Sequence, residues 1–168
     1  MKQLFFYLVG LVALTNTALA QSDCPCCTES HKQFDFWVGD WVVFDTEGKQ
    51  VGENTIVTLE QNCILNEHWR GATGYTGRSY NYYDSTDSTW NQLWVASDGS
   101  NLVLKGKASE NQMELKSKMI PGKKVDWYYN RITWTNNEDG TVTQLWEILD
   151  EGDNLLTVAF KGIYKRRE

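Results

Sequence analysis

The strongest constraint in this sequence is an alternation of polar and apolar side chains with a period of two, which runs from residue 40 onward. The alternating runs are rich in Thr, Val, Tyr and Trp, and turn-forming residues separate them. Because residues two apart share one face of a β-strand, this period predicts strands. We expect ten strands, at residues 41–45, 54–60, 64–70, 77–83, 90–96, 102–107, 112–118, 127–135, 142–149 and 155–164.

The connections between these runs are short, which favours antiparallel pairing of neighbours along the chain. No helical period is present to cover the edge of an open sheet. A closed barrel removes its edges, so we predict an all-β fold made of a single antiparallel up-and-down β-barrel of about ten strands. The alternative is a sandwich of two sheets.

Length and charge narrow the classes of function. The length of 168 residues suits one domain, and we place that domain at residues 34–168. The formal net charge of the chain is −6. An acidic chain lacks the clustered Lys and Arg that phosphate binding needs, so we expect no nucleic acid as partner. Aromatic residues make up 13% of a chain that is polar on average, which predicts no membrane span. We expect a monomer or a weak dimer.

The first twenty residues have the pattern of a signal peptide. Lys2 is followed by an apolar stretch that is too short to span a membrane, and residues 18–20 read Ala-Leu-Ala, a typical cleavage site. We therefore predict export, with cleavage after Ala20, into the periplasm or beyond. Disulfides form in such oxidising compartments.

Three of the four cysteines lie in a short segment, 21–33, ahead of the barrel: Cys24, Cys26 and Cys27. Cys63 lies within the barrel sequence, and we expect it to pair with one of those three. Two other interpretations stay open. The three cysteines with His31 could bind copper or zinc, or a remaining CxC pair could be redox-active.

Several strand faces combine large aromatic side chains with one or two polar groups. If these faces point inward, they line an aromatic pocket with a few polar groups, which is the usual make-up of a small-molecule site. The candidate ligand-binding residues are Glu67, Trp69, Asn81, Tyr83, Trp90, Gln92, Trp94, Trp127, Arg131, Gln144 and Trp146. Such a pocket would bind a small hydrophobic or amphiphilic molecule. The alternatives are a fully packed interior, or the reverse orientation, with the aromatic faces exposed. On the chosen faces, Trp134 would lie on the outside.

Catalysis and haem binding are the other functional alternatives. Glu67 as a general base and Arg131 as an anion stabiliser would suit an isomerase or cyclase. His68 is the one barrel histidine, and its neighbours Glu67 and Trp69 place it on the outward face, which disfavours haem. We expect no cofactor and no bound metal.

Residues 34–41, FDFWVGDW, resemble the opening signature of a family of bacterial secreted, lipocalin-like proteins of unknown function. Similar motifs continue downstream, such as EHWRG at 67–71 and TWNQLW at 89–94, so the resemblance covers residues 31–166. It implies a barrel of the calycin group, in which Trp41 closes one end and Arg166 or Arg167 packs across it. It also implies a disulfide between Cys27 and Cys63.

Overall fold

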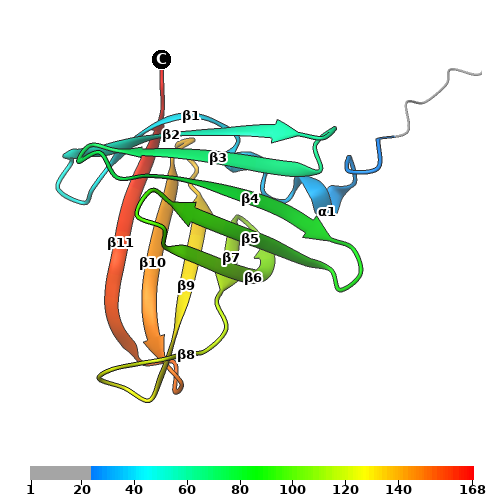
Figure 1. The fold of residues 1–168 in the computed structure, drawn as a ribbon. Helices are drawn as coiled ribbons and strands as arrows, with labels where there is room; N and C mark the ends of the chain where they lie inside the picture. The colour runs from blue at the N-terminus through cyan, green and yellow to red at the C-terminus, as the bar shows by residue number, and fades with distance from the viewer. Residues whose placement is uncertain (1–23) are drawn as a thin grey trace, which may run out of the picture.

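The fold is seen in a computed structural model that describes residues 24–168 (Figure 1). The predicted signal peptide and its cleavage site lie outside these residues. Eleven strands follow a single turn of α-helix, α1 (Glu29–Lys32), and a 3-10 turn, η1 (Asp35–Trp37). The strands are β1 (Gly39–Phe44), β2 (Gln50–Leu59), β3 (Ile64–Gly71), β4 (Thr76–Asp84), β5 (Thr89–Ala96), β6 (Asn101–Ser109), β7 (Gln112–Lys116), β8 (Ile120–Pro121), β9 (Trp127–Asn136), β10 (Val142–Asp150) and β11 (Leu155–Arg166).

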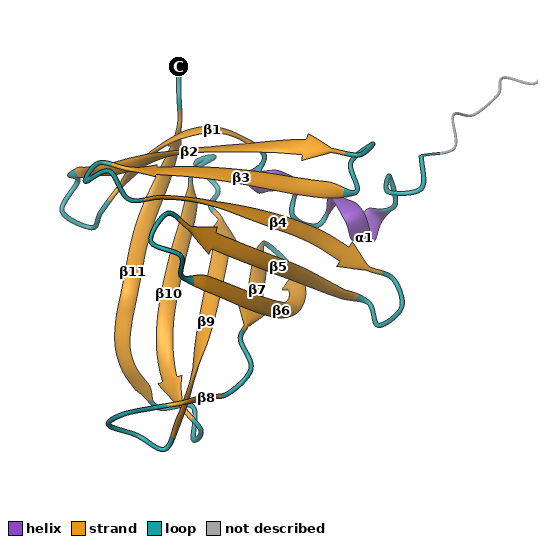
Figure 2. Cartoon of the chain, in the orientation of Figure 1, coloured by secondary structure: helices purple, strands orange, loops and turns teal. Residues whose placement is uncertain are grey.

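Ten of these strands close into an antiparallel barrel, which confirms the predicted fold. Each strand pairs with its neighbour in the order β10, β11, β1 to β7 and β9, and pairing of β9 with β10 completes the ring. The two-residue strand β8 pairs with β9 alone. Figure 2 shows the ring as strands with short connections. Closure rules out the two-sheet sandwich, and the fold is consistent with a calycin or lipocalin-like barrel. All ten predicted runs overlap a strand; β8 and the two helical turns were not predicted.

The segment before β1 closes one end of the barrel. Phe34 and Trp37 are fully buried and stack with their ring centroids 4.9 Å apart. Both also pack on Trp134 of β9, at centroid distances of 5.2 and 5.3 Å. These three aromatic side chains form a plug at this end of the barrel. At the opposite end, where the β1–β2 and β3–β4 hairpins turn, the described residues form no comparable plug.

Trp41 packs against an arginine at the closed end of the barrel, as the resemblance implied. Trp41 is buried, its indole Nε1 donates a 2.8 Å hydrogen bond to the Trp37 carbonyl, and the Arg166 guanidinium lies 4.1 Å from the ring centroid. Arg166 also donates a 2.7 Å hydrogen bond to the Val38 carbonyl. A Cβ atom on Gly39 would collide with this guanidinium, and Gly39 has a φ of +141°, so the arrangement needs glycine there.

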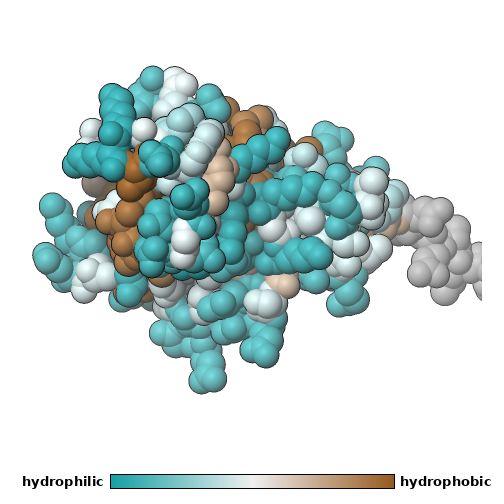
Figure 3. Space-filling view, turned by 90° about the horizontal axis from the view of Figure 1, so that it is seen from below, coloured by the Kyte–Doolittle hydropathy of each residue, from teal (hydrophilic) through white to brown (hydrophobic). Residues whose placement is uncertain are grey.

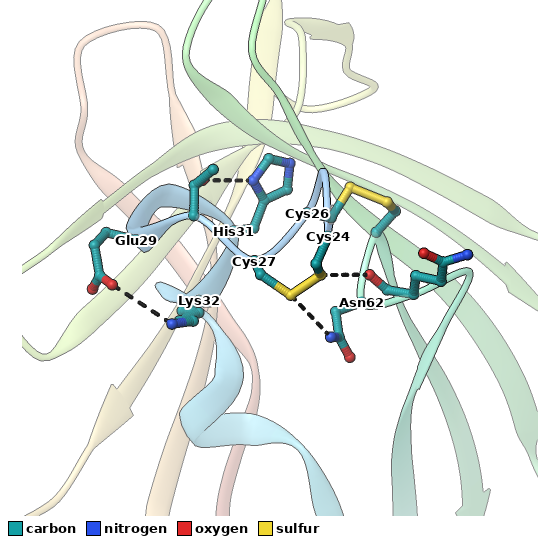
Figure 4. Close-up of a disulfide and its surroundings, with 10 residues drawn as sticks. Cys24, Cys26, Cys27, Glu29, His31, Lys32 and Asn62 are labelled. Carbon is teal, nitrogen blue, oxygen red and sulfur yellow. Dashed lines mark hydrogen bonds and ion pairs between the residues drawn. A yellow bond between two sulfur atoms is a disulfide. The ribbon is translucent and has the colours of Figure 1, made fainter. Parts of the chain in front are cut away.

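The predicted disulfide between Cys27 and Cys63 is wrong. Cys26 pairs with Cys63, and Cys24 pairs with Cys27 (Figure 4). Cys26 and Cys27 are adjacent, and the turn of the segment directs the Cys26 side chain toward the β2–β3 connection, while Cys27 turns back to Cys24. The Cys26–Cys63 bond ties the plug segment to the barrel wall.

All four cysteines are bonded, so neither the metal site nor the free CxC pair exists in this structure.

No helix among the described residues is long and apolar enough to cross a membrane. The outer face seen from below in Figure 3 is mainly hydrophilic, with apolar side chains gathered in one region of it.

Candidate functional site

The barrel encloses a cavity of about 450 Å³, within the range of small-molecule sites. Its walls come from strands β2, β3, β5, β6 and β9–β11, and its mouth reaches the β1–β2 and β3–β4 turns. The lining residues are Lys49, Gln50, Val51, Glu67, Trp69, Gly71, Ala72, Thr73, Tyr75, Gln92, Trp94, Leu102, Ile132, Trp134, Gln144, Trp146, Ala159, Phe160 and Tyr164. The interior is therefore not fully packed.

Most of the predicted pocket residues on β3, β5 and β10 line this cavity. They are Glu67, Trp69, Gln92, Trp94, Gln144 and Trp146. The predicted inward faces of these strands are thus correct, and His68 lies on the outer face as expected. Its Nδ1 atom is 3.1 Å from Arg70 Nη1 and 3.3 Å from Arg78 Nη2. Burial, together with these two arginines, lowers the pKa of His68.

Three predicted residues point inward without lining the cavity. Asn81 is fully buried beneath it. Trp90 and Tyr83 lie toward the plug: Trp90 packs edge-on against Phe34 at 5.7 Å, and Tyr83 contacts His31 at 5.1 Å between ring centroids. These two aromatic side chains support the closed end of the barrel.

The prediction for β9 is wrong, because the opposite face of this strand points inward. Trp127 is 44% exposed, and Arg131 forms an ion pair with Glu147 on the outer wall, with 3.0 Å between Nη2 and Oε2. The inward residues are Ile132 and Trp134, and Trp134 is only 1% exposed rather than on the surface. The proposed pairing of Glu67 with Arg131, and the catalytic role built on it, is therefore excluded.

Glu67 lies at the base of the cavity and is held by two donors. Asn54 Nδ2 donates a 2.7 Å hydrogen bond to Oε1, and Ser79 Oγ donates a 2.6 Å hydrogen bond to Oε2. Both donors come from strands that flank β3, since Asn54 pairs with Trp69 in the register of β2 and Ser79 pairs with Glu67 in that of β4. The carboxyl group is thus fixed in place by the sheet.

The hydrogen bonds extend from Glu67 in both directions around the barrel. On one side, Asn81 Nδ2 donates to Ser79 Oγ at 2.9 Å, and Gln92 Nε2 donates to Asn81 Oδ1 at 2.7 Å.

On the other side, Asn54 Nδ2 also lies 3.5 Å from the Tyr164 hydroxyl, which donates to Gln144 Oε1. The buried Asn54 Oδ1 has no hydrogen-bond partner. One network therefore joins polar groups of β2, β3, β4, β5, β10 and β11.

Burial sets the protonation of this network. Removal from water raises the pKa of Glu67 to about 7, against the opposing effect of the Ser79 and Asn54 hydrogen bonds. Burial also raises the pKa of Tyr164 well above its ordinary value, with the nearby Glu67 carboxylate adding to the shift. Tyr164 is therefore neutral at physiological pH, and the Glu67 carboxyl group titrates in that range.

The aromatic walls depend on two inward-facing glycines. A Cβ atom on Gly77 would stand 2.2 Å from Trp94 Cζ2, and one on Gly52 would stand 2.5 Å from Trp69 Cη2. Each indole therefore packs directly against the glycine backbone of the adjacent strand. The rings occupy the wall instead of the barrel centre, which leaves the cavity open.

Several residues that build the site were not identified from the sequence. Ile132, Trp134, Phe160 and Tyr164 line the cavity, and Asn54 holds Glu67. Phe160 and Tyr164 share one face of the strand predicted at 155–164, but Gly162 lies between them on that face and adds no polar group that would indicate a site. Asn54 fell at the first residue of its predicted run.

The cavity lining, as formed by the described residues, contains no histidine. Among residues 24–168, no group of three His, Cys, Asp or Glu side chains could hold a metal ion. His31 lies outside the cavity, where its Nδ1 is 2.7 Å from Thr28 Oγ1. The site is therefore a hydrogen-bonded carboxyl group within aromatic walls.

The fold and site define a closed antiparallel barrel with an internal aromatic cavity. Comparison of this chain with models of known protein families and with curated proteins finds no match.

Proposed function

We propose that this chain is an exported, lipocalin-like protein that binds a small hydrophobic or amphiphilic molecule in its barrel. The observation that carries the proposal is the 450 Å³ cavity, whose walls are mostly apolar and rich in aromatic rings, with polar groups at Glu67, Gln92 and Gln144. Apolar walls supply the free energy of binding, and a few fixed polar groups orient the ligand. The similarity of residues 34–41 to secreted lipocalin-like proteins supports membership of that family.

Export is supported by the two disulfides. Disulfides persist in oxidising compartments; here Cys26–Cys63 links the plug segment to the barrel, and Cys24–Cys27 lies within that segment. The signal-peptide pattern of residues 1–20 adds to this argument.

Binding is tested with N-phenyl-1-naphthylamine, an uncharged probe that fluoresces in apolar sites. Leu102 lines the cavity, so Leu102→Trp fills it, whereas Val103→Trp puts the same ring on the outer face of β6, where Val103 is 61% exposed. We expect saturable one-to-one binding to the wild type and to Val103→Trp, with affinity at least ~10-fold lower in Leu102→Trp. Absence of saturable binding to the wild type, or equal binding to both variants, contradicts the proposal.

A further inference from the structure

Resting on the proposed binding function, we infer that the cavity selects organic cations, that is, amines or quaternary ammonium groups attached to an apolar body. Three features of the described residues carry this inference: the charge of the groups that line the cavity, the aromatic character of its walls, and the lack of a cationic partner for the carboxyl group at its base.

The charged groups of the cavity favour a positive ligand. Glu67 is the acidic group of the lining, and it lies at the base with 5% of its surface exposed. The other lining groups that can titrate are Tyr164, Tyr75 and Lys49. Tyr164 stays neutral, Tyr75 is 40% exposed, and Lys49 is exposed in the β1–β2 turn. A ligand at the base therefore meets a carboxyl group and no buried cation.

The walls provide the second recognition element. Besides Tyr75 of the β3–β4 turn, six aromatic side chains line the cavity: Trp69, Trp94, Trp134, Trp146, Phe160 and Tyr164. The faces of such rings attract cations, with Trp the strongest, and the attraction grows when water is excluded. Trp146 Nε1 donates a 2.8 Å hydrogen bond to Asn130 Oδ1. This bond uses the N–H edge of the indole and leaves the face of the ring available for contact with a cation.

Among residues 24–168, no positive side chain pairs with the buried acid Glu67. Its two close neighbours, Asn54 and Ser79, are neutral donors. Arg131, the cation predicted to act with it, lies on the outer wall with Glu147. A buried carboxylate is stabilised far more by an opposite charge than by neutral donors. A bound ammonium group supplies that charge.

The base of the cavity disfavours an anionic ligand, such as a fatty acid. Its carboxylate would be buried beside Glu67 without an Arg or Lys side chain at the base of the cavity. Burying two like charges together is costly. The net charge of −6 also raises the local concentration of cations over that of anions.

The test compares three soluble probes that share one apolar body: 4-phenylbutyltrimethylammonium, 4-phenylbutanol and 4-phenylbutanoate. Affinities are measured at pH 8.5 by calorimetry on the full mature chain. We expect the ammonium compound to bind at least ~10-fold more tightly than the alcohol, and the carboxylate most weakly. We also expect lowering the pH to 5.5 to weaken binding of the ammonium compound at least ~5-fold while leaving the alcohol unchanged, because Glu67 becomes protonated.

The matched variants are Glu67→Gln and Glu138→Gln, which change the net charge equally. Glu138 is exposed in the β9–β10 turn, outside the cavity. Glu67→Gln is expected to remove the preference for the ammonium compound and its pH dependence, whereas Glu138→Gln keeps both. The pH series on the wild type tests the inference independently of how the variants fold.

The outcomes separate this inference from the proposed function. Binding of the alcohol or the carboxylate at least as tightly as the ammonium compound overturns the cation preference and leaves the binding function standing. A preference that survives in Glu67→Gln also overturns it. Failure of all three probes and of the uncharged fluorescent probe overturns both.

Discussion

Ser79 donates a 2.6 Å hydrogen bond to Oε2 of Glu67 from the strand next to it, so that two directly paired residues set the chemistry at the base of the cavity. The bond stabilises the charged form of Glu67, while burial stabilises the neutral form. The balance of these two effects brings the pKa of Glu67 to about 7. The effect of a substitution near this pair on the protonation of Glu67 can therefore be measured near physiological pH.

Replacing Ser79 with Ala removes one of the two donors to Glu67. We expect the pKa of Glu67 to rise further above about 7, because a hydrogen bond to the carboxylate lowers the pKa and its loss leaves burial less opposed. Carboxyl NMR of the labelled protein across pH 4 to 10 measures the shift. Ser85→Ala, in the exposed β4–β5 turn, is the control. An unchanged or lower pKa in Ser79→Ala contradicts the expectation.

Protein stability should fall as pH rises through the neutral range. Glu67 has an ordinary pKa of 4.5 when unfolded and about 7 when folded, so the folded state binds its proton more tightly. This stabilisation is complete below pH 4.5 and is lost as pH rises toward 7 and above, by up to about 3 kcal/mol.

Urea unfolding of the wild type and Glu67→Gln, at intervals from pH 4.5 to 8.5, measures the effect with disulfides intact. The difference in unfolding free energy between the two proteins should shift in favour of Glu67→Gln as pH rises. A constant difference across this range rules out the raised pKa.

Gly77→Ala should close part of the cavity. The added Cβ would stand 2.2 Å from Trp94, so the indole must swing into the barrel or β4 must shift. We expect a loss of about 1–3 kcal/mol of stability and weaker binding of the uncharged fluorescent probe. Tyr82→Ala, on the outer face of the same strand, should leave probe binding unchanged. Unaltered binding in Gly77→Ala would show that the ring does not need this glycine.

The two disulfides should differ in their contributions to stability. Cys26–Cys63 spans 37 residues, whereas Cys24–Cys27 spans three. In the loop-entropy account, replacing the first pair with Ser costs about 4 kcal/mol and replacing the second about 2 kcal/mol. Urea unfolding of the two double variants measures both values. Peptide mapping of the native protein checks the pairing itself, and a Cys27–Cys63 peptide would contradict it.

The Arg131–Glu147 ion pair should support the outer wall only. Its side chains are 26% and 14% exposed, and a double-mutant cycle with Arg131→Ala and Glu147→Ala is expected to give about 1 kcal/mol of coupling. Probe binding should be unchanged in both variants. Lost binding in Arg131→Ala, with stability preserved, would reopen a role for Arg131 in the site.

Alternation in the sequence was enough to predict strand positions and to group the residues that share a face on β3, β5 and β10. The cavity lining shows that these faces point inward. On these strands one face held both the aromatic and the polar side chains, as with Trp90, Gln92 and Trp94. On β9 both faces carry aromatic residues, and Arg131 made the outer face look polar and functional. The pairing of β9 with its neighbours determines which of its faces points inward, because Trp134 pairs with Met113 and Gln144, which face inward.

The sequence by itself determined the strand positions and favoured a closed barrel, since alternating short runs without a helix leave few ways to satisfy the backbone at strand edges. The pairing of β9 with β10 decided it against a two-sheet sandwich. It also contained Glu67, Gln92 and Gln144 as candidate site residues. Only the tertiary structure decided that Glu67 is held by Asn54 and Ser79, that Arg131 lies outside, and that Cys26 pairs with Cys63. These depend on the register between strands and on how a short segment turns, both of which arise from contacts between residues distant along the chain.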